Sequence, residues 1–184
     1  IGNLRRVLSA GGVAAIPTET FYGLAADPGN AAGIRRIFHA KGREESKPLP
    51  VVFSSRAQLR DLGVGAADTL LDRWFAMWPA PLTVVLPIRE AIAASRGGSS
   101  LGVRVPASAD LVRLLERTGP LTATSANLAG EPPLSDPDEV ADAFGENIDL
   151  LIDGGQTPGG KPSTLIDATV DPPAVLRPGA FPWP

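Results

Sequence analysis

The chain has no cysteine and a single histidine, His39, among its 184 residues. Disulfides, thiolate nucleophiles, iron–sulfur clusters and Cys/His zinc sites are therefore excluded, and a Ser-His-Asp triad would need that one imidazole. The sequence also lacks an apolar run near the ~20 residues that span a bilayer, and its first residues lack the basic-then-apolar pattern of a signal peptide. We therefore expect a cytoplasmic protein with no membrane segment.

The length of the chain suits one domain. A protein of 184 residues and 19.1 kDa can bury roughly 70% of the surface that its unfolded chain exposes. Its 20 glycines and 19 prolines are dispersed along the sequence and do not collect in a linker. We expect a single domain over residues 1–184.

The charge of the chain is unevenly distributed. Residues 1–60 contain nine Lys/Arg against four Asp/Glu, whereas residues 131–184 contain two against ten. This asymmetry favours a site for an anion in the first third of the chain, with a solvated charged face as the alternative.

Short apolar segments alternate with capping residues along the chain. A helix over residues 4–8 leads into a buried strand at 13–16, and Asn30 can cap a helix that ends where Gly42 permits a left-handed residue. A helix over residues 70–78 is expected to place its aromatic residues in the core. Further helices are expected after Ser55, Ser108 and Asp136, and further strands at 49–53, 82–86, 101–105, 121–124, 150–152, 164–166 and 174–176. This order predicts an α/β domain with a mixed sheet.

The segment from Gly155 to Lys161 matches the G-x-x-x-x-G-K pattern of a phosphate-binding P-loop. That motif requires Ser or Thr as its next residue and a helix behind it, but Pro162 occupies this place and Pro158 interrupts the loop. We expect a mobile loop beside the site and not a phosphate cradle.

Two polar segments are better candidates for ligand binding. Lys41, Arg43 and Lys47 place three cations within seven residues, which favours anion binding, although cations also match the dipole at a helix C-terminus. The segment Thr122–Asn127 follows a predicted strand, where hydroxyl and amide groups serve either a ligand or an ordinary turn.

These segments belong to a series of motifs that resembles one family, the YrdC-like threonylcarbamoyl-AMP synthases. The resemblance runs from about residue 11 to residue 179. Its motifs are PTETFYGL at 17–24, KGR at 41–43 with KPL at 47–49, WPAPLT at 78–83, VRVP at 103–106, TSAN at 124–127, DGG at 153–155, STLID at 163–167 and LRPG at 176–179.

The resemblance implies the YrdC-like fold, an open twisted mixed sheet flanked by helices. It implies condensation of L-threonine, bicarbonate and ATP into threonylcarbamoyladenylate with release of pyrophosphate, which serves tRNA threonylcarbamoyladenosine modification. Downstream tRNA threonylcarbamoyltransferase proteins are the implied partners, with possible tRNA or RNA contact. Mg²⁺ would be bound mainly through ATP phosphates, with no metal site of the protein's own.

The same resemblance implies roles for individual residues. The catalytic residues would be Lys41 and Arg43. ATP would be bound by Arg43, Lys47, Ser100, Ser125, Asn127 and Arg177. Threonine would be bound by Thr20, Arg104, Ser163 and the backbone at Ala123, with Arg104 on its carboxylate. Val52 stands where many relatives carry a histidine that touches threonine, so hydroxyl recognition would fall to Thr20, Ser163 or water.

The chemistry agrees with this scarcity of nucleophilic side chains. A carbamate oxygen that attacks the α-phosphorus meets like-charge repulsion, so the protein mainly needs cations, hydrogen-bond donors and close positioning of the reactants. Two alternatives remain open: a carbamoyl adenylate-forming domain of the hydrogenase-maturation type, and a noncatalytic RNA-binding module. The absence of cysteine opposes the first, and the net charge of −3 opposes the second.

Overall fold

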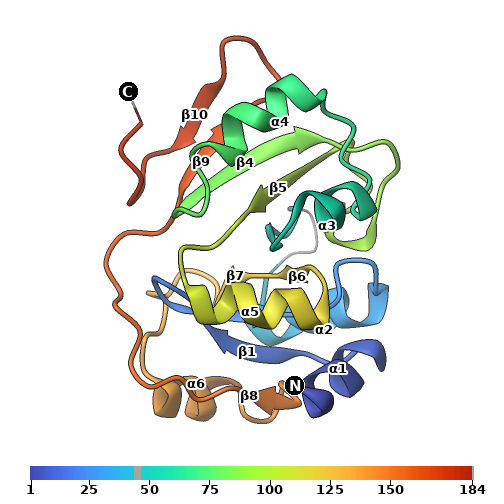
Figure 1. Cartoon of the computed structure of the whole chain (residues 1–184). Helices are drawn as coiled ribbons and strands as arrows, with labels where there is room; N and C mark the ends of the chain where they lie inside the picture. The colour runs from blue at the N-terminus through green and yellow to red at the C-terminus, as the bar shows by residue number, and fades with distance from the viewer. Residues whose placement is uncertain (44–46, 184) are drawn as a thin grey trace.

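The strands form two sheets in the computed structural model, which describes residues 1–43 and 47–183 (Figure 1). The smaller sheet has the order β7-β2-β1-β8 and the larger β10-β9-β4-β5-β3-β6. The strands are Ala14–Pro17 (β1), Tyr22–Ala25 (β2), Val51–Val52 (β3), Leu82–Pro87 (β4), Ser100–Arg104 (β5), Leu121–Thr122 (β6), Thr124–Ser125 (β7), Leu150–Leu151 (β8), Thr164–Asp167 (β9) and Ala174–Arg177 (β10). Each sheet contains parallel and antiparallel pairs. The expected α/β class with mixed strand directions is confirmed, with two sheets in place of one.

The chain passes from the larger sheet to the smaller one at Ala123. β6 pairs antiparallel with β3, whereas β7 pairs antiparallel with β2. Between them the amide of Ala123 donates to the carbonyl of Pro50 over 2.9 Å. The single strand expected over residues 121–124 is therefore divided between the sheets, and this division joins the two sheets at one point.

The helices begin and end largely where the capping residues predict. Their bounds are Gly2–Ser9 (α1), Ala31–Lys41 (α2), Arg56–Asp61 (α3), Asp68–Phe75 (α4), Ala109–Thr118 (α5) and Pro137–Phe144 (α6), with a 3₁₀ turn at Ala93–Ser95. The side chains of Asn30, Ser55, Ser108 and Asp136 each accept a backbone N–H at a helix start, a cap that contributes about 1 kcal/mol. Gly42 ends α2 at φ +58°, as expected. None of the described helices is long and apolar enough to cross a membrane.

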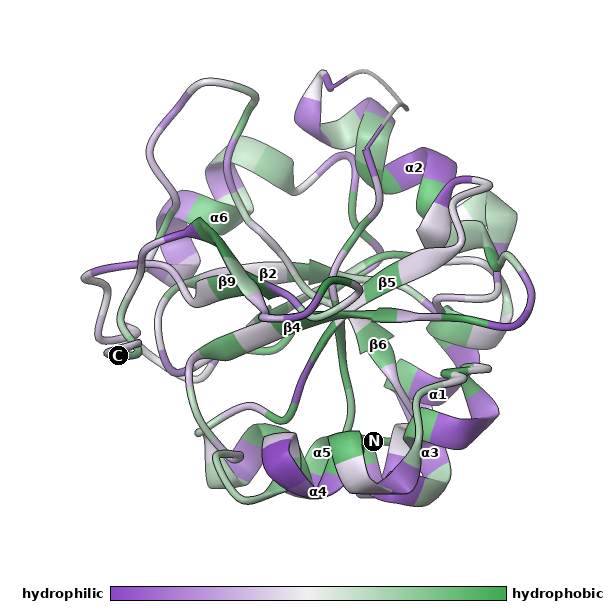
Figure 2. Cartoon of the chain, turned by 90° about the horizontal axis from the view of Figure 1, so that it is seen from above, coloured by the Kyte–Doolittle hydropathy of each residue, from purple (hydrophilic) through white to green (hydrophobic). Residues whose placement is uncertain are grey.

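Buried side chains form two clusters around the sheets. The larger includes Trp74 and Trp78, and the ring of Phe53 meets that of Trp78 edge to face at 5.4 Å, so the aromatic residues of this segment lie in the core as expected. The smaller packs leucines of α1 and α5 against β1, β2, β3 and β6. Figure 2 shows hydrophobic residues along the central strands and mixed polarity on the surrounding helices.

Candidate functional site

A cavity of about 360 Å³ opens between the two sheets. β2 and β7 line it from the smaller sheet, and the ends of β5, β9 and β10 line it from the larger one. The structure brings together there most of the residues that the sequence singles out. These are Thr20, Arg43, Lys47, Arg104, Ala123, Ser125, Ser163 and Arg177.

Cationic side chains dominate the electrostatics of this cavity. Arg43, Lys47, Arg104 and Arg177 line it, and none of the described lining residues is acidic. Burial lowers the pKa of Arg104 and of Arg177, although a guanidinium remains charged at physiological pH. Like charges held together in a partly desolvated space repel one another, so the cavity is suited to a ligand with several negative charges.

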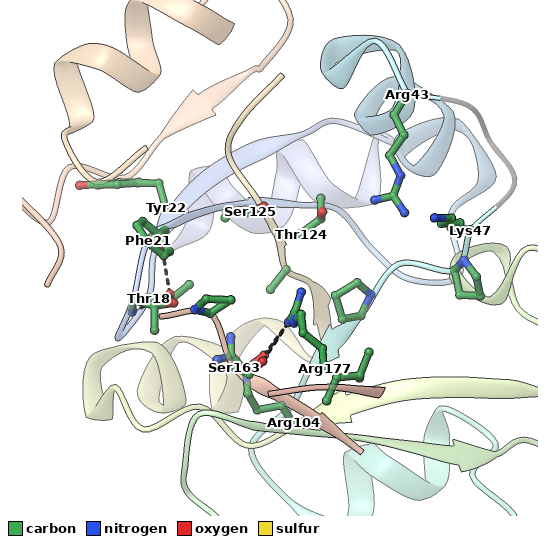
Figure 3. Close-up of a pocket in the computed structure, with 17 residues that line it drawn as sticks. Thr18, Phe21, Tyr22, Arg43, Lys47, Arg104, Thr124, Ser125, Ser163 and Arg177 are labelled. Carbon is green, nitrogen blue, oxygen red and sulfur yellow. Dashed lines mark hydrogen bonds between the residues drawn. The ribbon is translucent and has the colours of Figure 1, made fainter. Parts of the chain in front are cut away.

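The cations divide between two parts of the cavity. Arg43 and Lys47 lie together at one side, Arg104 and Ser163 lie at the other, and the Arg177 guanidinium lies between them (Figure 3). Arg43 follows the left-handed Gly42 that ends α2, and its guanidinium lies 5.9 Å from the centre of the Phe38 ring. The intervening residues 44–46 of the cation-rich segment lie outside the described residues.

Lys41 is not among the residues that line the cavity, but its ammonium forms hydrogen bonds with Ser125 and Asn127 at the cavity wall. Nζ donates to the carbonyls of Ser125 and Asn127 and, over 3.1 Å, to Oδ1 of Asn127. Oδ1 of Asn127 also accepts from the Ser125 hydroxyl over 2.5 Å. The three donors of one ammonium thus tie the end of α2 to the segment after β7. This geometry favours a positioning role for Lys41 and Asn127, and Ser125 alone of the three lines the cavity.

If ATP is the ligand, as the motifs imply, we predict that its binding weakens above pH 8 because of Lys41. Burial, assisted by the nearby charge of Arg43, lowers the pKa of Lys41 to about 8. Below this pH Nζ is charged and supplies three donors, whereas the neutral amine above it supplies two. The hydrogen bond that is lost joins Lys41 to the cavity wall and not to ATP, so its free energy of about 1 kcal/mol sets the upper limit of the effect, a rise of up to about fivefold in the ATP dissociation constant between pH 7 and pH 9.

Titration of ATP in the absence of amino acid checks this pH dependence. Lys41→Met should bind ATP weakly already at pH 7 and lose the dependence, whereas the matched control Lys161→Met, which changes an exposed lysine, should keep it. A dependence that survives in Lys41→Met would contradict the assignment.

On the side of the cavity opposite Arg43, hydroxyl groups lie beside the buried guanidinium of Arg104. Oγ of Ser163 lies 2.9 Å from Oγ1 of the buried Thr83, and Nη2 of Arg177 donates to the Ser163 carbonyl over 2.9 Å. The Thr20 hydroxyl lies 3.2 Å from that of Thr18. These contacts hold the hydroxyls in place, which suits recognition of a small polar molecule.

Two residues emphasised in the sequence lie away from the cavity lining. Ser100 begins β5, four residues before Arg104, and a rise of about 3.3 Å per residue separates them by about 13 Å. Val52 is 1% exposed and packs with Leu111 and Leu121 in the smaller core cluster. Val52 therefore makes no direct contact with the space of the described cavity.

The segment 155–161 does not form a P-loop. No helix follows it, and the chain enters β9 at Thr164. The amide of Gly159 donates to the carbonyl of Thr20 over 2.6 Å, and the Tyr22 hydroxyl donates to the carbonyl of Gly155 over 2.8 Å. The segment therefore lies beside the site, as expected, with Lys161 exposed.

The structure adds Glu19 to the surroundings of the site, a residue whose role the sequence by itself does not indicate. Glu19, within the PTETFYGL motif, forms an ion pair with Arg104, and the side chains are 13% and 8% exposed. The motif contains this carboxylate, but the sequence alone does not show that it lies beside an arginine 85 positions away.

One ion pair among the described residues joins the basic first third of the chain to its acidic last third. Arg36 forms a bidentate pair with Asp149, with N···O distances of 2.6 and 3.0 Å, and this pair links the basic first third to the acidic last third. The Arg36 guanidinium also lowers the pKa of Asp149. Only Arg43 and Lys47 of the cations before residue 60 line the cavity in the described part of the chain.

Comparison with known proteins shows the family of this chain. The family model Sua5_yciO_yrdC, described as "Telomere recombination", matches residues 6–179. The chain belongs to the Sua5/YciO/YrdC family. The resemblance read from the motifs is thereby confirmed, and the match spans both sheets and every residue that lines the cavity.

Individual relatives in the Sua5/YciO/YrdC family resemble the chain along most of its length. A threonylcarbamoyl-AMP synthase of Pyrococcus abyssi is 40% identical over 178 residues, which cover 94% of this chain and 52% of the relative. A structure of P. abyssi Sua5 complexed with L-threonine superposes with a TM-score of 0.90 at 37% identity, over 98% of this chain and 54% of that one. E. coli YciO gives a TM-score of 0.85 at 26% identity, over 97% and 88%. The chain spans about half the length of the first two curated relatives that it matches.

Proposed function

We propose that the chain is a threonylcarbamoyl-AMP synthase that joins L-threonine, bicarbonate and ATP and releases pyrophosphate. The observation that carries this proposal is the division of one cationic cavity into two parts, with Arg43 and Lys47 on one side and Arg104 with small hydroxyls on the other. A triphosphate suits the first part, and an amino acid carboxylate suits the second. The relatives named as threonylcarbamoyl-AMP synthases support the same assignment.

The residue roles follow from these positions. Arg43 and Lys47 would hold the ATP phosphates, with Ser125 as a hydroxyl donor and Arg177 at the junction of the two substrates. Arg104 would hold the threonine carboxylate, and Thr20, Ser163 and the backbone at Ala123 would complete that subsite. Lys41 and Asn127 would support the phosphate side through their contacts with Ser125.

The proposed reaction brings two anions together, a carbamate and the triphosphate of ATP. The threonine amine, in its neutral form, and bicarbonate would form a carbamate, as a carbon–oxygen bond of bicarbonate breaks and water leaves. One carbamate oxygen then bonds to the α-phosphorus while the bond from that phosphorus to the pyrophosphate oxygen breaks. Arg177 lies beside both parts of the cavity, where its charge would offset repulsion between the carbamate and the phosphates. This chemistry needs no nucleophilic side chain, in keeping with a sequence without cysteine.

Mg²⁺ is proposed to enter with ATP. The described residues include no group of three or more His, Cys, Asp or Glu side chains that could hold a metal ion. Phosphate oxygens and water would therefore bind it, and it would supply charge neutralisation at the phosphates. The threonylcarbamoyladenylate is proposed to pass to tRNA threonylcarbamoyltransferase proteins.

A pyrophosphate-release assay tests the proposed function. We expect release that depends on L-threonine, bicarbonate and ATP together, with less release when L-serine replaces threonine. Release with a carbamoyl donor in the absence of amino acid would instead support the adenylating enzyme of the hydrogenase-maturation type. Binding of RNA without any pyrophosphate release would support the noncatalytic module.

A further inference from the structure

Only one of the two oxygens of the Glu19 carboxylate has a hydrogen-bond partner among the described residues. Its Oε1 accepts from Nη1 of Arg104, while its Oε2 is buried and has no hydrogen-bond partner among the described residues. Burying a charged acceptor without a partner is costly, so such an atom in a folded protein points to a donor that a ligand supplies. The other such atom in the described residues, Nε1 of Trp74, lies in the hydrophobic core.

The surroundings of Glu19 identify which ligand group that would be. Thr18 and Thr20, on either side of it in the sequence, line the cavity, and so does Arg104. Glu19 is the only hydrogen-bond partner that the described residues give the Arg104 side chain, and it uses Nη1. A guanidinium has five N–H donors, so the others remain for a substrate carboxylate.

A substrate carboxylate on Arg104 would lie next to the negative charge of Glu19. A simple carboxylic acid would be repelled there. An α-amino acid carries its ammonium on the carbon next to its carboxylate, so the ammonium could lie between the two carboxylates. Glu19 does not itself line the cavity and its Oε2 is buried, so a bond from the ammonium to Oε2 requires the Glu19 side chain to turn toward the ligand. A buried Arg/Glu pair is thus complementary in charge to a zwitterion.

We propose that the Glu19 carboxylate binds the α-ammonium group of the amino acid whose carboxylate Arg104 holds. This inference rests on the proposed function, because it deepens the assignment of an amino acid substrate to this side of the cavity. Glu19 then makes the site selective for α-amino acids over other carboxylates, and it holds the nitrogen that, after loss of a proton, bonds to the carbon of bicarbonate.

The test compares two ligands in two proteins. Calorimetric titration measures the affinity of the full chain for L-threonine and for 3-hydroxybutyrate, which keeps the carboxylate and hydroxyl but lacks the amino group. We expect Glu19→Gln to weaken L-threonine binding about 10- to 100-fold, as for loss of a charge-assisted contact. Binding of 3-hydroxybutyrate should stay the same or strengthen, because a repelling charge is removed while the glutamine oxygen can still accept from Arg104.

A purely structural role for Glu19 predicts a different result. If Glu19 only orients Arg104, both ligands depend on it alike, and equal weakening of both would overturn the proposal. Unchanged ATP affinity shows that Glu19→Gln is folded. Should it not fold, Glu19→Asp keeps the charge on a shorter side chain and should weaken L-threonine binding selectively, and equal weakening there would also overturn the proposal.

The outcome for wild type separates this inference from the proposed function. If wild type binds another α-amino acid but releases no pyrophosphate with threonine, the proposed function fails, and that amino acid with its deaminated analogue provides the same test of Glu19. If pyrophosphate is released with threonine but Glu19→Gln weakens both ligands equally, the function stands and the Glu19 assignment fails. Wild type that binds no α-amino acid would overturn both.

Discussion

Replacement of Arg104 by alanine is expected to raise the threonine requirement of the proposed reaction at least 100-fold at saturating ATP and bicarbonate. Two parallel hydrogen bonds from a buried guanidinium to a carboxylate would be lost, and each contributes about 1.5 kcal/mol or more. Arg104 is 7% exposed, so little water can replace it. Steady-state titration of threonine measures the effect.

The buried pair with Glu19 complicates the choice of Arg104 variant. Removal of Arg104 leaves the Glu19 carboxylate without its partner, and breaking a buried pair in this way costs about 3–5 kcal/mol of stability. Arg104→Lys provides a second variant, because it keeps a positive charge for Glu19 but loses the planar fork. We expect it to fold and still to raise the threonine requirement strongly. A threonine dependence like that of wild type in either folded variant would refute the role of Arg104.

Arg43→Ala is expected to weaken ATP use by about 10- to 150-fold while leaving the fold intact. The loss of one charge-assisted contact in a partly desolvated site costs about 1.5–3 kcal/mol. Arg43 is half-buried after the end of α2 and belongs to neither core cluster, and its contact with the Phe38 ring is a minor contribution to stability. ATP titration, pyrophosphate release and thermal unfolding measure the two effects separately.

Lys161→Ala is the matched control for Arg43→Ala. It removes an exposed cation from the glycine-rich segment that matches part of the P-loop pattern, and this residue does not line the cavity. We expect nearly unchanged ATP affinity in this variant. If Lys161→Ala weakened ATP binding as much as Arg43→Ala, the segment would have to be reinterpreted as a phosphate site. Unchanged affinity in a folded Arg43→Ala protein would remove Arg43 from the ATP site.

The local structure of this protein could be predicted from its sequence. The caps at Asn30, Ser108 and Asp136 and the left-handed Gly42 depend on bonds and backbone angles within a few positions of each residue. The family could also be read from its ordered motifs, and Pro162 was sufficient to reject a P-loop. All of these features are local or depend on the order of residues along the chain.

The tertiary structure decided which of these features meet. The division of residues 121–124 between two sheets depends on which strands pair with each half, and residues far away in the sequence set that pairing. The contacts of Lys41 and Glu19 likewise could not be predicted from the sequence. Lys41 bonds to the wall of the cavity, and Glu19 pairs with Arg104 of the larger sheet. Side-chain types predict the chemistry that is available, but strand pairing and packing determine which charges lie within bonding distance.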